Sequence, residues 1–439
     1  MALGGGTFLV QNKVLPGAYI NTVSMASASA NLSDRGYAAL PLEMDWGPQG
    51  KIFTVEQSDF LNSSQKIFGY SYTADALRPM REIFCHAKTV YFFRLGTGGV
   101  KADCTFGTAR YPGTRGNALR VVITASENSE REHPLYDVET FLDTRKVETQ
   151  KGISTAAELV DNDFIVWKDG AVLALTASTP LTGGTNGTVS DGDHQTFLDQ
   201  AESRAFNALG CTSTNDTVKK LYAAYTKRMR NDVGKKFQCV VFRSLADDEG
   251  VISLKNTVTD AGAAPAALIP WAVGVAAGTA VNKSATNMVY DGEYAPDTNY
   301  TQTQLEAGIR EGSLMIHDVD GTARVLSDIN TFVSVTDEKT ADFSSNQTVR
   351  VLDQIANDIA LLFGKKYLGS VPNDGAGRIS LWNDIVSHHQ KLQSIRALED
   401  FTPEDITVEK GETKKSVFVS DSVTPVNAME QLYMMVYVH

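Results

Sequence analysis

The stretch that decides the fold runs from Thr179 to Ala201 and reads TPLTGGTNGTVSDGDHQTFLDQA. Two adjacent glycines, Gly183 and Gly184, are followed by Gly187 and then by Asp-Gly-Asp, after which the pattern becomes helical. Such a segment can be a phosphate-binding loop, a calcium loop or a connector between two parts of a chain. Each role needs different partner residues, so the surrounding sequence decides among them.

The two ion-binding interpretations lack their partner residues. A phosphate loop of the type G-x-x-x-x-G-K-[ST] needs a lysine at fixed spacing, and residues 183–188 supply neither the lysine nor the spacing. An EF-hand needs a full set of oxygen ligands, and residues 191–193 supply only a fragment, so one anion or Ca²⁺ contact is the alternative left open. We therefore predict a Gly-rich connector over residues 183–192, whose glycines permit turns with positive φ and whose Asp193 caps the next helix.

On the N-terminal side of the connector, the sequence reads as short strands separated by turn signals. Scarcely any helical period occurs between Val100 and Pro180. The triplet Lys168-Asp169-Gly170 lies between two apolar runs, which predicts a hairpin turn. We expect an all-β sandwich over residues 98–182, inserted into a chain of another pattern.

That other pattern, on both sides of the insertion, alternates strands and helices. The apolar runs at 88–96 and 237–245 are typical of strands buried on both faces. Ser58 and Thr73 are candidate N-caps of two helices. The alternation predicts one discontinuous α/β domain, over residues 31–97 and 193–330.

The last third of the chain predicts an α+β domain over residues 331–428. Apolar residues from Val351 to Leu362 repeat with a helical period, and a second helix is expected from Gly377 to Leu398. Strand-like runs follow, DITVEK and KSVFVS. The fold class is thus α+β multidomain.

Both ends of the chain read as extended arms. Within an arm of residues 1–30, the strand-like segment Ala18–Val23 has no nearby partner in sequence. Residues 429–439 form a C-terminal arm whose segment Leu432–Val438 is apolar throughout. Because an unpaired apolar strand favours aggregation, we expect each to pair with a distant segment or with another molecule.

Composition narrows the class of protein. With 52 acidic against 40 basic residues, the net charge of -12 argues against a general nucleic-acid binder. The N-terminus lacks the basic and apolar regions of a signal peptide. The most apolar window, residues 264–281, contains two prolines and is better read as a buried helix than as a membrane span.

No motif for catalysis or metal binding occurs. The four cysteines are scattered and are expected to be buried and reduced, as in a cytosolic protein. The seven histidines show no metal-ligand spacing, and neither a G-x-S-x-G elbow nor a dinucleotide fingerprint is present. For adjacent His388 and His389 we expect one packed and one solvated ring, with a pH sensor or ligand pair as the alternative. The sequence predicts no catalytic residue, no cofactor and no metal.

The segments VLPGAYINTVS, LSDRGYAALPLEMDWGP and LTGGTNGT, together with the domain order, resemble contractile-tail sheath proteins. The resemblance covers essentially the whole chain and is greatest to the short sheaths of myophages, prophages and R-type bacteriocins of Gram-positive bacteria. It implies a structural subunit that polymerises in sixfold layers around an inner tail tube and contracts to drive the tube through the target cell envelope. It also implies a subtilisin-like topology for the α/β domain, without catalysis.

The resemblance assigns roles to particular residues. Terminal arms in the family add strands to the C-terminal domain of a neighbouring subunit. The N-terminal strand would comprise Ala18, Tyr19, Ile20, Asn21, Thr22 and Val23, and the C-terminal strand Leu432, Tyr433, Met434, Met435, Val436, Tyr437 and Val438. A helix of the C-terminal domain faces the tube in the family, so Arg378, Lys391 and Arg396 are expected to meet acidic groups there.

The partners implied are further copies of the chain, the inner tail tube protein, the baseplate and the tail terminator, without nucleic acid or direct membrane insertion. Assembly is expected in the cytoplasm of the bacterial host, and the product is a virion tail or a released bacteriocin particle. Two other classes remain as alternatives. One is another self-assembling shell or surface-lattice protein, and the other is a hydrolase that uses the α/β domain.

Overall fold

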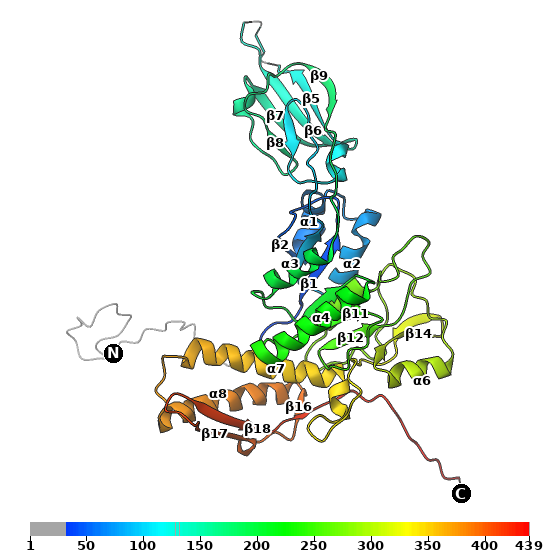
Figure 1. Cartoon of the computed structure of the whole chain (residues 1–439), viewed down its shortest axis with the longest axis vertical. Coiled ribbons are helices and arrows are strands. Elements are labelled where there is room, and N and C mark those ends of the chain that lie inside the picture. Colours follow the sequence, from blue (N-terminus) through cyan, green and yellow to red (C-terminus); the bar gives the residue numbers. More distant parts are fainter. Residues whose placement is uncertain (1–31, 128, 131, 439) are drawn as a thin grey trace, which may run out of the picture. The chain divides into compact units, whose positions relative to one another are not determined.

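A computed structural model describes residues 32–127, 129–130 and 132–438 (Figure 1). The expected N-terminal strand, Ala18–Val23, lies outside these residues. The described chain divides into two compact units. A larger unit contains residues 33–357, 392–401 and 423–438, and a smaller unit contains residue 32, residues 358–391 and residues 402–422. The protein is multidomain α+β, as the sequence predicts.

A seven-stranded sheet forms the centre of the larger unit. Its order is β13-β12-β11-β10-β1-β3-β2, and every neighbouring pair is parallel except β2 with β3. The strands are β1 (Tyr37–Glu43), β2 (Ile52–Glu56), β3 (Thr89–Leu95), β10 (Ala208–Cys211), β11 (Gln238–Phe242), β12 (Val251–Leu254) and β13 (Ser313–Leu314). β3 and β11 coincide with the two apolar runs, because strands covered on both faces need apolar residues at every position.

Helices cover both faces of this sheet. Successive residues of β1 point to opposite faces, so Ala38 and Leu40 join one core while Ala39 joins the other. The first core is closed by α1 (Gln57–Phe68), α2 (Arg78–Phe84) and α5 (Ile269–Gly278), and the second by α3 (Asp191–Ala201) and α4 (Asp216–Arg228). Helix α5 confirms that the most apolar window is a buried helix. Helix α6 (Gln302–Arg310) and the hairpin of β14 (Ile316–Val319) and β15 (Thr322–Val325) complete this region.

Two predicted helix caps are wrong. The N-cap of helix α1 is Glu56, so the helix begins two residues earlier than a cap at Ser58 would place it. Helix α2 follows a 3₁₀ turn, Asp75–Leu77, and carries proline in its first turn, so Thr73 does not cap it. Proline has no N–H to be capped and its fixed φ suits a helix start, which explains the shift.

The inserted β module has two small sheets around one core. One sheet has the order β7-β6-β5-β9 and the other contains β4 and β8. The strands are β4 (Gly107–Ala109), β5 (Leu119–Ala125), β6 (Tyr136–Leu142), β7 (Arg145–Ile153), β8 (Ile165–Trp167) and β9 (Thr176–Pro180). The hairpin predicted at residues 168–170 is wrong, because β8 pairs with β4 and β9 pairs with β5. The chain does turn at residues 168–170, but it then passes from the sheet of β8 to the sheet of β9 instead of returning beside β8.

Two antiparallel segments join the β module to the seven-stranded sheet. Bridges link Thr97 with Thr188 and Val100 with Thr185, so the outgoing and returning chains run side by side. Gly187 has φ +80, and a Cβ there would lie 2.1 Å from the Thr97 carbonyl oxygen. Only glycine fits this position. The returning segment enters α3 through a capping box in which the Ser190 N–H donates to Asp193 Oδ2 at 2.7 Å. Ser190 is therefore the N-cap, and the prediction of Asp193 was wrong by one turn.

Three side chains fasten the β module to the sheet. Trp46, from the loop between β1 and β2, is 1% exposed and belongs to the core of the β module. Buried Arg94 of β3 donates to the carbonyl oxygens of Gly47 and Pro112, and desolvation lowers the pKa of its guanidinium. Arg115 of the β module donates to the Gly69 carbonyl at 2.7 Å. The joint is thus packed and hydrogen-bonded.

The C-terminal region contains α7 (Asn346–Leu362), a π-helical turn (Phe363–Tyr367) and α8 (Gly375–Ser394). The smaller unit also contains the hairpin of β17 (Ile406–Lys410) and β18 (Val417–Asp421), while β16 (Leu398–Glu399) pairs with β19 (Thr424–Pro425) in the larger unit. The predicted end of α8 at Leu398 is wrong. The helix stops at Ser394, because Arg396 adopts φ +61 and the Ala397 N–H returns to the Leu392 carbonyl.

Candidate functional site

The C-terminal arm is the longest exposed apolar segment in the described part of the chain. Residues 431–438 adopt no helix or strand. Leu432 is 85% exposed, Tyr433 88% and Val438 92%. The arm therefore buries almost none of its apolar surface within this chain, although burial is what normally holds such residues. Whether it becomes a strand of a neighbouring subunit stays a prediction.

The hairpin β17–β18 offers edges to which such a strand can be added. It forms a two-stranded sheet, with register from Ile406↔Asp421 to Lys410↔Val417. Each strand has one partner among the described residues, so both outer edges present backbone groups without a ladder partner. Phe418 on β18 is 61% exposed. An extended segment can pair with such an edge through backbone hydrogen bonds.

Within the smaller unit, two buried histidines of α8 contact the hairpin and α7, one each. His389 Nε2 lies 2.9 Å from Asp421 Oδ2 of β18, and His388 Nε2 lies 3.0 Å from Asp358 Oδ2 of α7. The two Nδ1 atoms are 3.4 Å apart. Trp382 Nε1 also donates to the Ile406 carbonyl of β17, at 3.0 Å. The expectation of one packed and one solvated ring is wrong, because both rings are buried and each faces a carboxylate.

The structure does not bring the three predicted tube-facing cations together. Arg378 lies in the first turn of α8 and donates to the Asn373 carbonyl at 3.2 Å. Lys391 lies in the last turn of α8, about 20 Å along the helix axis at 1.5 Å per residue. Arg396 is exposed in the turn after the helix. They cannot form one contact with a single acidic group.

A basic and apolar surface near the start of α8 was not predicted. Within the smaller unit, a cavity of about 100 Å³ is lined by Phe363, Leu368, Arg378 and Lys415, among others. Leu368 and Ile379 are 66% and 62% exposed. We call this surface the α8 pocket. The doublets Lys365-Lys366 and Lys414-Lys415 were the available sequence signal, since they concentrate positive charge in an acidic chain.

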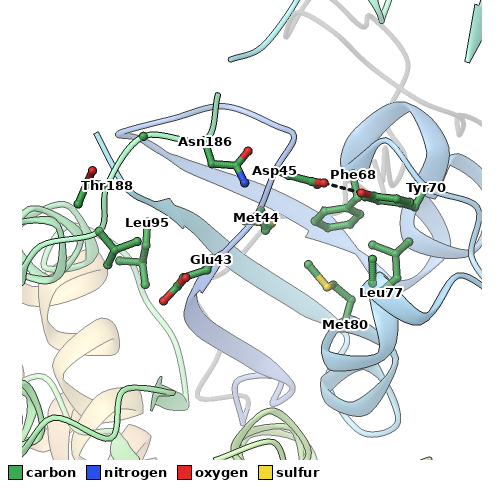
Figure 2. A pocket seen from close by; sticks show the side chains of 13 residues that line it. Glu43, Met44, Asp45, Phe68, Tyr70, Leu77, Met80, Leu95, Asn186 and Thr188 are labelled. Carbon is green, nitrogen blue, oxygen red and sulfur yellow. Dashed lines mark hydrogen bonds between the residues drawn. The ribbon is translucent and has the colours of Figure 1, made fainter. Parts of the chain in front are cut away.

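A cavity lies at the carboxyl ends of β1 and β3, where parallel sheets commonly bind ligands (Figure 2). Its volume is about 540 Å³, and the connector residues Asn186–Val189 form one wall. Asp45 accepts a hydrogen bond from the Tyr70 hydroxyl, as Figure 2 shows. Burial and then Asp45 raise the pKa of Tyr70, so this hydroxyl remains a donor. The lining residues that the structure describes include the carboxylates of Glu43 and Asp45 and the hydroxyls of Tyr70 and Thr188, but no histidine, serine, cysteine or lysine.

A second cluster combines thiol, imidazole and carboxylate groups but is not arranged for catalysis. His86 Nε2 lies 3.1 Å from Asp291 Oδ1, which also accepts from Trp271 Nε1 at 2.8 Å. Although Cys85 is exposed at the surface, desolvation by the surrounding protein and then the Asp291 charge raise the pKa of its thiol to about 12, so the thiol stays protonated. Cys85 is exposed and Cys104 half-buried, so the expectation that all four thiols are buried is wrong, although all four are free.

No group of three or more His, Cys, Asp and Glu side chains in the described residues is placed to hold a metal ion. Among the described helices, none has the length and apolar character needed to cross a bilayer.

Four family models match consecutive parts of the chain. They are the tail sheath protein Gp18 domain III N-terminal region (35–95), the phage tail sheath protein beta-sandwich domain (97–186), the central domain (187–331) and the C-terminal domain (338–439). The phage-like element PBSX protein XkdK of Bacillus subtilis (strain 168) is 30% identical, and the alignment covers 100% of both chains. The chain belongs to the phage tail sheath family. It is a tail sheath protein of a contractile phage or injection system.

Solved sheath structures agree with this assignment. A sheath tail protein from Desulfitobacterium hafniense superposes with a TM-score of 0.81 at 33% identity, covering 95% of this chain and 99% of that one. The helical sheath of the anti-feeding prophage in the contracted state matches with a TM-score of 0.57 at 14% identity, over 97% and 99% of the two chains. That second likeness concerns the fold alone. Tail sheath proteins are structural components of particles and are not enzymes.

Proposed function

We propose that this sheath protein polymerises as a helical, sixfold cylinder around an inner tail tube and contracts to drive the tube through the target cell envelope. The single observation that carries the proposal is the exposed apolar arm at 431–438, in a chain whose hairpin β17–β18 has no strand on either outer edge among the described residues. A strand added from one copy to the next makes a head-to-tail contact that need not close into a ring. Such a contact generates a filament and tolerates rotation between the bodies that it links.

The remaining assignments follow from the same proposal. The segment Ala18–Val23 supplies a second strand, and Leu432–Val438 supplies the C-terminal one. The connector glycines Gly183, Gly184 and Gly187 carry the chain between the β module (98–182) and an α/β domain of subtilisin-like topology (31–97 and 193–330). A C-terminal domain over 331–428 lies next to the tube. Assembly takes place in the host cytoplasm, with the tube, baseplate and tail terminator as partners.

Electron microscopy of the purified chain tests polymerisation. We expect hollow tubes, and we expect a variant that lacks residues 1–25 to form none while its circular dichroism and melting temperature match those of the full chain. Loss of tubes with an intact fold would show that the N-terminal arm acts between subunits. Flat sheets from the full chain would instead favour a surface-lattice protein, and normal tubes from the truncated chain would contradict the arm assignment.

The tube-facing assignment also remains part of the proposal. Arg378 lines the α8 pocket beside Lys415, so a positively charged, partly apolar surface is available to an acidic partner. We expect the charge reversals Arg378→Glu, Lys391→Glu and Arg396→Glu each to reduce co-assembly with the tube protein, and the loss to be greatest for Arg378. Polymers formed without tube protein should be unchanged, which is the control. Co-assembly at wild-type levels in all three variants would refute the assignment.

A further inference from the structure

One buried carboxamide holds the base of the C-terminal arm. Gln347, in the first turn of α7, is 3% exposed. Its Nε2 donates to the Val426 carbonyl at 2.9 Å, and its Oε1 accepts from the Ala428 N–H at 3.0 Å. These two backbone groups flank Asn427 and are the pair that a neighbouring strand would engage. Gln347 therefore takes the place of a strand partner for one residue of the arm's base.

The side chains of Asn427 and Glu430 add further contacts to this clamp. The Asn427 side chain accepts from Ser345 Oγ at 3.1 Å and donates to Thr348 Oγ1 at 3.0 Å. Glu430 accepts from Thr286 Oγ1 at 2.7 Å and from Ser327 Oγ at 3.0 Å. All of these residues belong to the larger unit. The chain is thus tied to α7 and to the loops beside it as far as Glu430.

Beyond Glu430 the contacts change within one residue. The hydrogen bonds of the described residues 431–438 are local, from Tyr433 Oη to Gln431 Oε1 and from Tyr437 Oη to Met435 Sδ. The large side chains from Leu432 to Val438 are 69–92% exposed. A fixed base therefore precedes a free apolar segment.

We propose that Gln347 is a positioning residue for strand exchange, which fixes the point from which residues 431–438 reach a second copy of this chain. This inference rests on the proposed function of the arm. A fixed base keeps the tether short, and the effective concentration of a tethered segment falls with roughly the -3/2 power of tether length. Losing the whole base, which means the Asn427 and Glu430 contacts as well as the clamp, would lengthen the free segment from 431–438 to 426–438. That change lowers the effective concentration about twofold before the cost of ordering the released residues is added. Losing the clamp alone loosens the base in part.

Gln347→Leu in the full chain removes both hydrogen bonds while keeping a side chain of similar size in a buried position. We expect hydrogen exchange of the Ala428 amide to quicken about tenfold, because a net hydrogen bond has about that effect. Exchange in 432–438 should not change. Gln195→Leu is the matched control, since Gln195 lies early in α3 and its exposed amide contacts only Asp199 among the bonds described. The control should exchange as the wild type does throughout 426–438.

The assembly readout is the critical concentration for tube formation, measured by sedimentation. We expect Gln347→Leu to raise it by up to about twofold with an unchanged melting temperature, and Gln195→Leu to leave it unchanged. If Gln347→Leu fails to fold, Gln347→Met replaces it, because methionine also removes both hydrogen bonds and its flexible side chain adapts to a buried position. Faster exchange with an unaltered critical concentration would overturn the proposal, as would unaltered exchange. Normal polymers from a chain lacking residues 431–439 would refute the arm function itself, which is a separate result.

Discussion

Deleting residues 431–439 is expected to abolish tubes and to leave the melting temperature of the monomer unchanged. The large apolar side chains of the segment are 69–92% exposed, so removing them takes almost no buried surface from the fold. The clamp through Gln347 ends before the deletion, so the base of the arm keeps its contacts. Only the surface offered to another copy is lost. Negative-stain microscopy and thermal denaturation of the same sample measure both effects.

A point substitution distinguishes strand pairing from unspecific apolar adhesion. Met435→Pro removes one N–H and fixes φ, so a strand can no longer pair through that residue, while most of the apolar surface is kept. Met435→Leu is the control, since it keeps both the N–H and the size. We expect tubes from Met435→Leu and a loss of tubes, or at least a tenfold higher critical concentration, from Met435→Pro. Equal polymerisation of the two variants would mean that the arm does not join a sheet.

The central sheet could be predicted because its signal is local. Strands covered on both faces need apolar residues at every position, and the runs that became β3 and β11 have this pattern. Which strands pair with each other was harder to predict from the sequence. The triplet at 168–170 has good turn residues, yet β8 pairs with β4, which lies far earlier in the chain. Alternating apolar residues fix which face of a strand is buried but not which strand lies beside it.

The candidate site, too, could be predicted only in part. The apolar run at the C-terminus is visible in the sequence, and the exposure of that run is what makes it a candidate for assembly. The partners of His389 and Gln347 are not visible, because Asp421 is 32 residues from His389 and the Val426 carbonyl is 79 residues from Gln347. Arg396 was misplaced because no local residue marks the left-handed turn that ends α8.

The second large effect is expected for Trp46→Ala, at the joint between the β module and the central sheet. Trp46 stands edge-on to Tyr111 with ring centroids 5.4 Å apart and lies 6.2 Å from Phe164, both in the β module. Its Nε1 donates to the Lys66 carbonyl of α1 at 3.4 Å. The indole therefore contacts both bodies. Truncating a buried tryptophan costs about 3–5 kcal/mol, and here the loss falls on the joint.

Trp167→Ala is the matched control, because Trp167 is also buried in the core of the β module but lies within it, donating to the Val160 carbonyl at 3.1 Å. Hydrogen exchange separates the two variants. We expect Trp46→Ala to quicken exchange in the bridging segments 97–103 and 182–188 while β5 and β6 stay protected, and Trp167→Ala to quicken exchange within the β module. The reason is that the joint then loses its buried aromatic contact and keeps its backbone bridges and the hydrogen bonds of Arg94 and Arg115, which contribute about 0.5–3 kcal/mol each. Bridging segments as protected in Trp46→Ala as in the wild type would show that the two connector chains suffice without the indole.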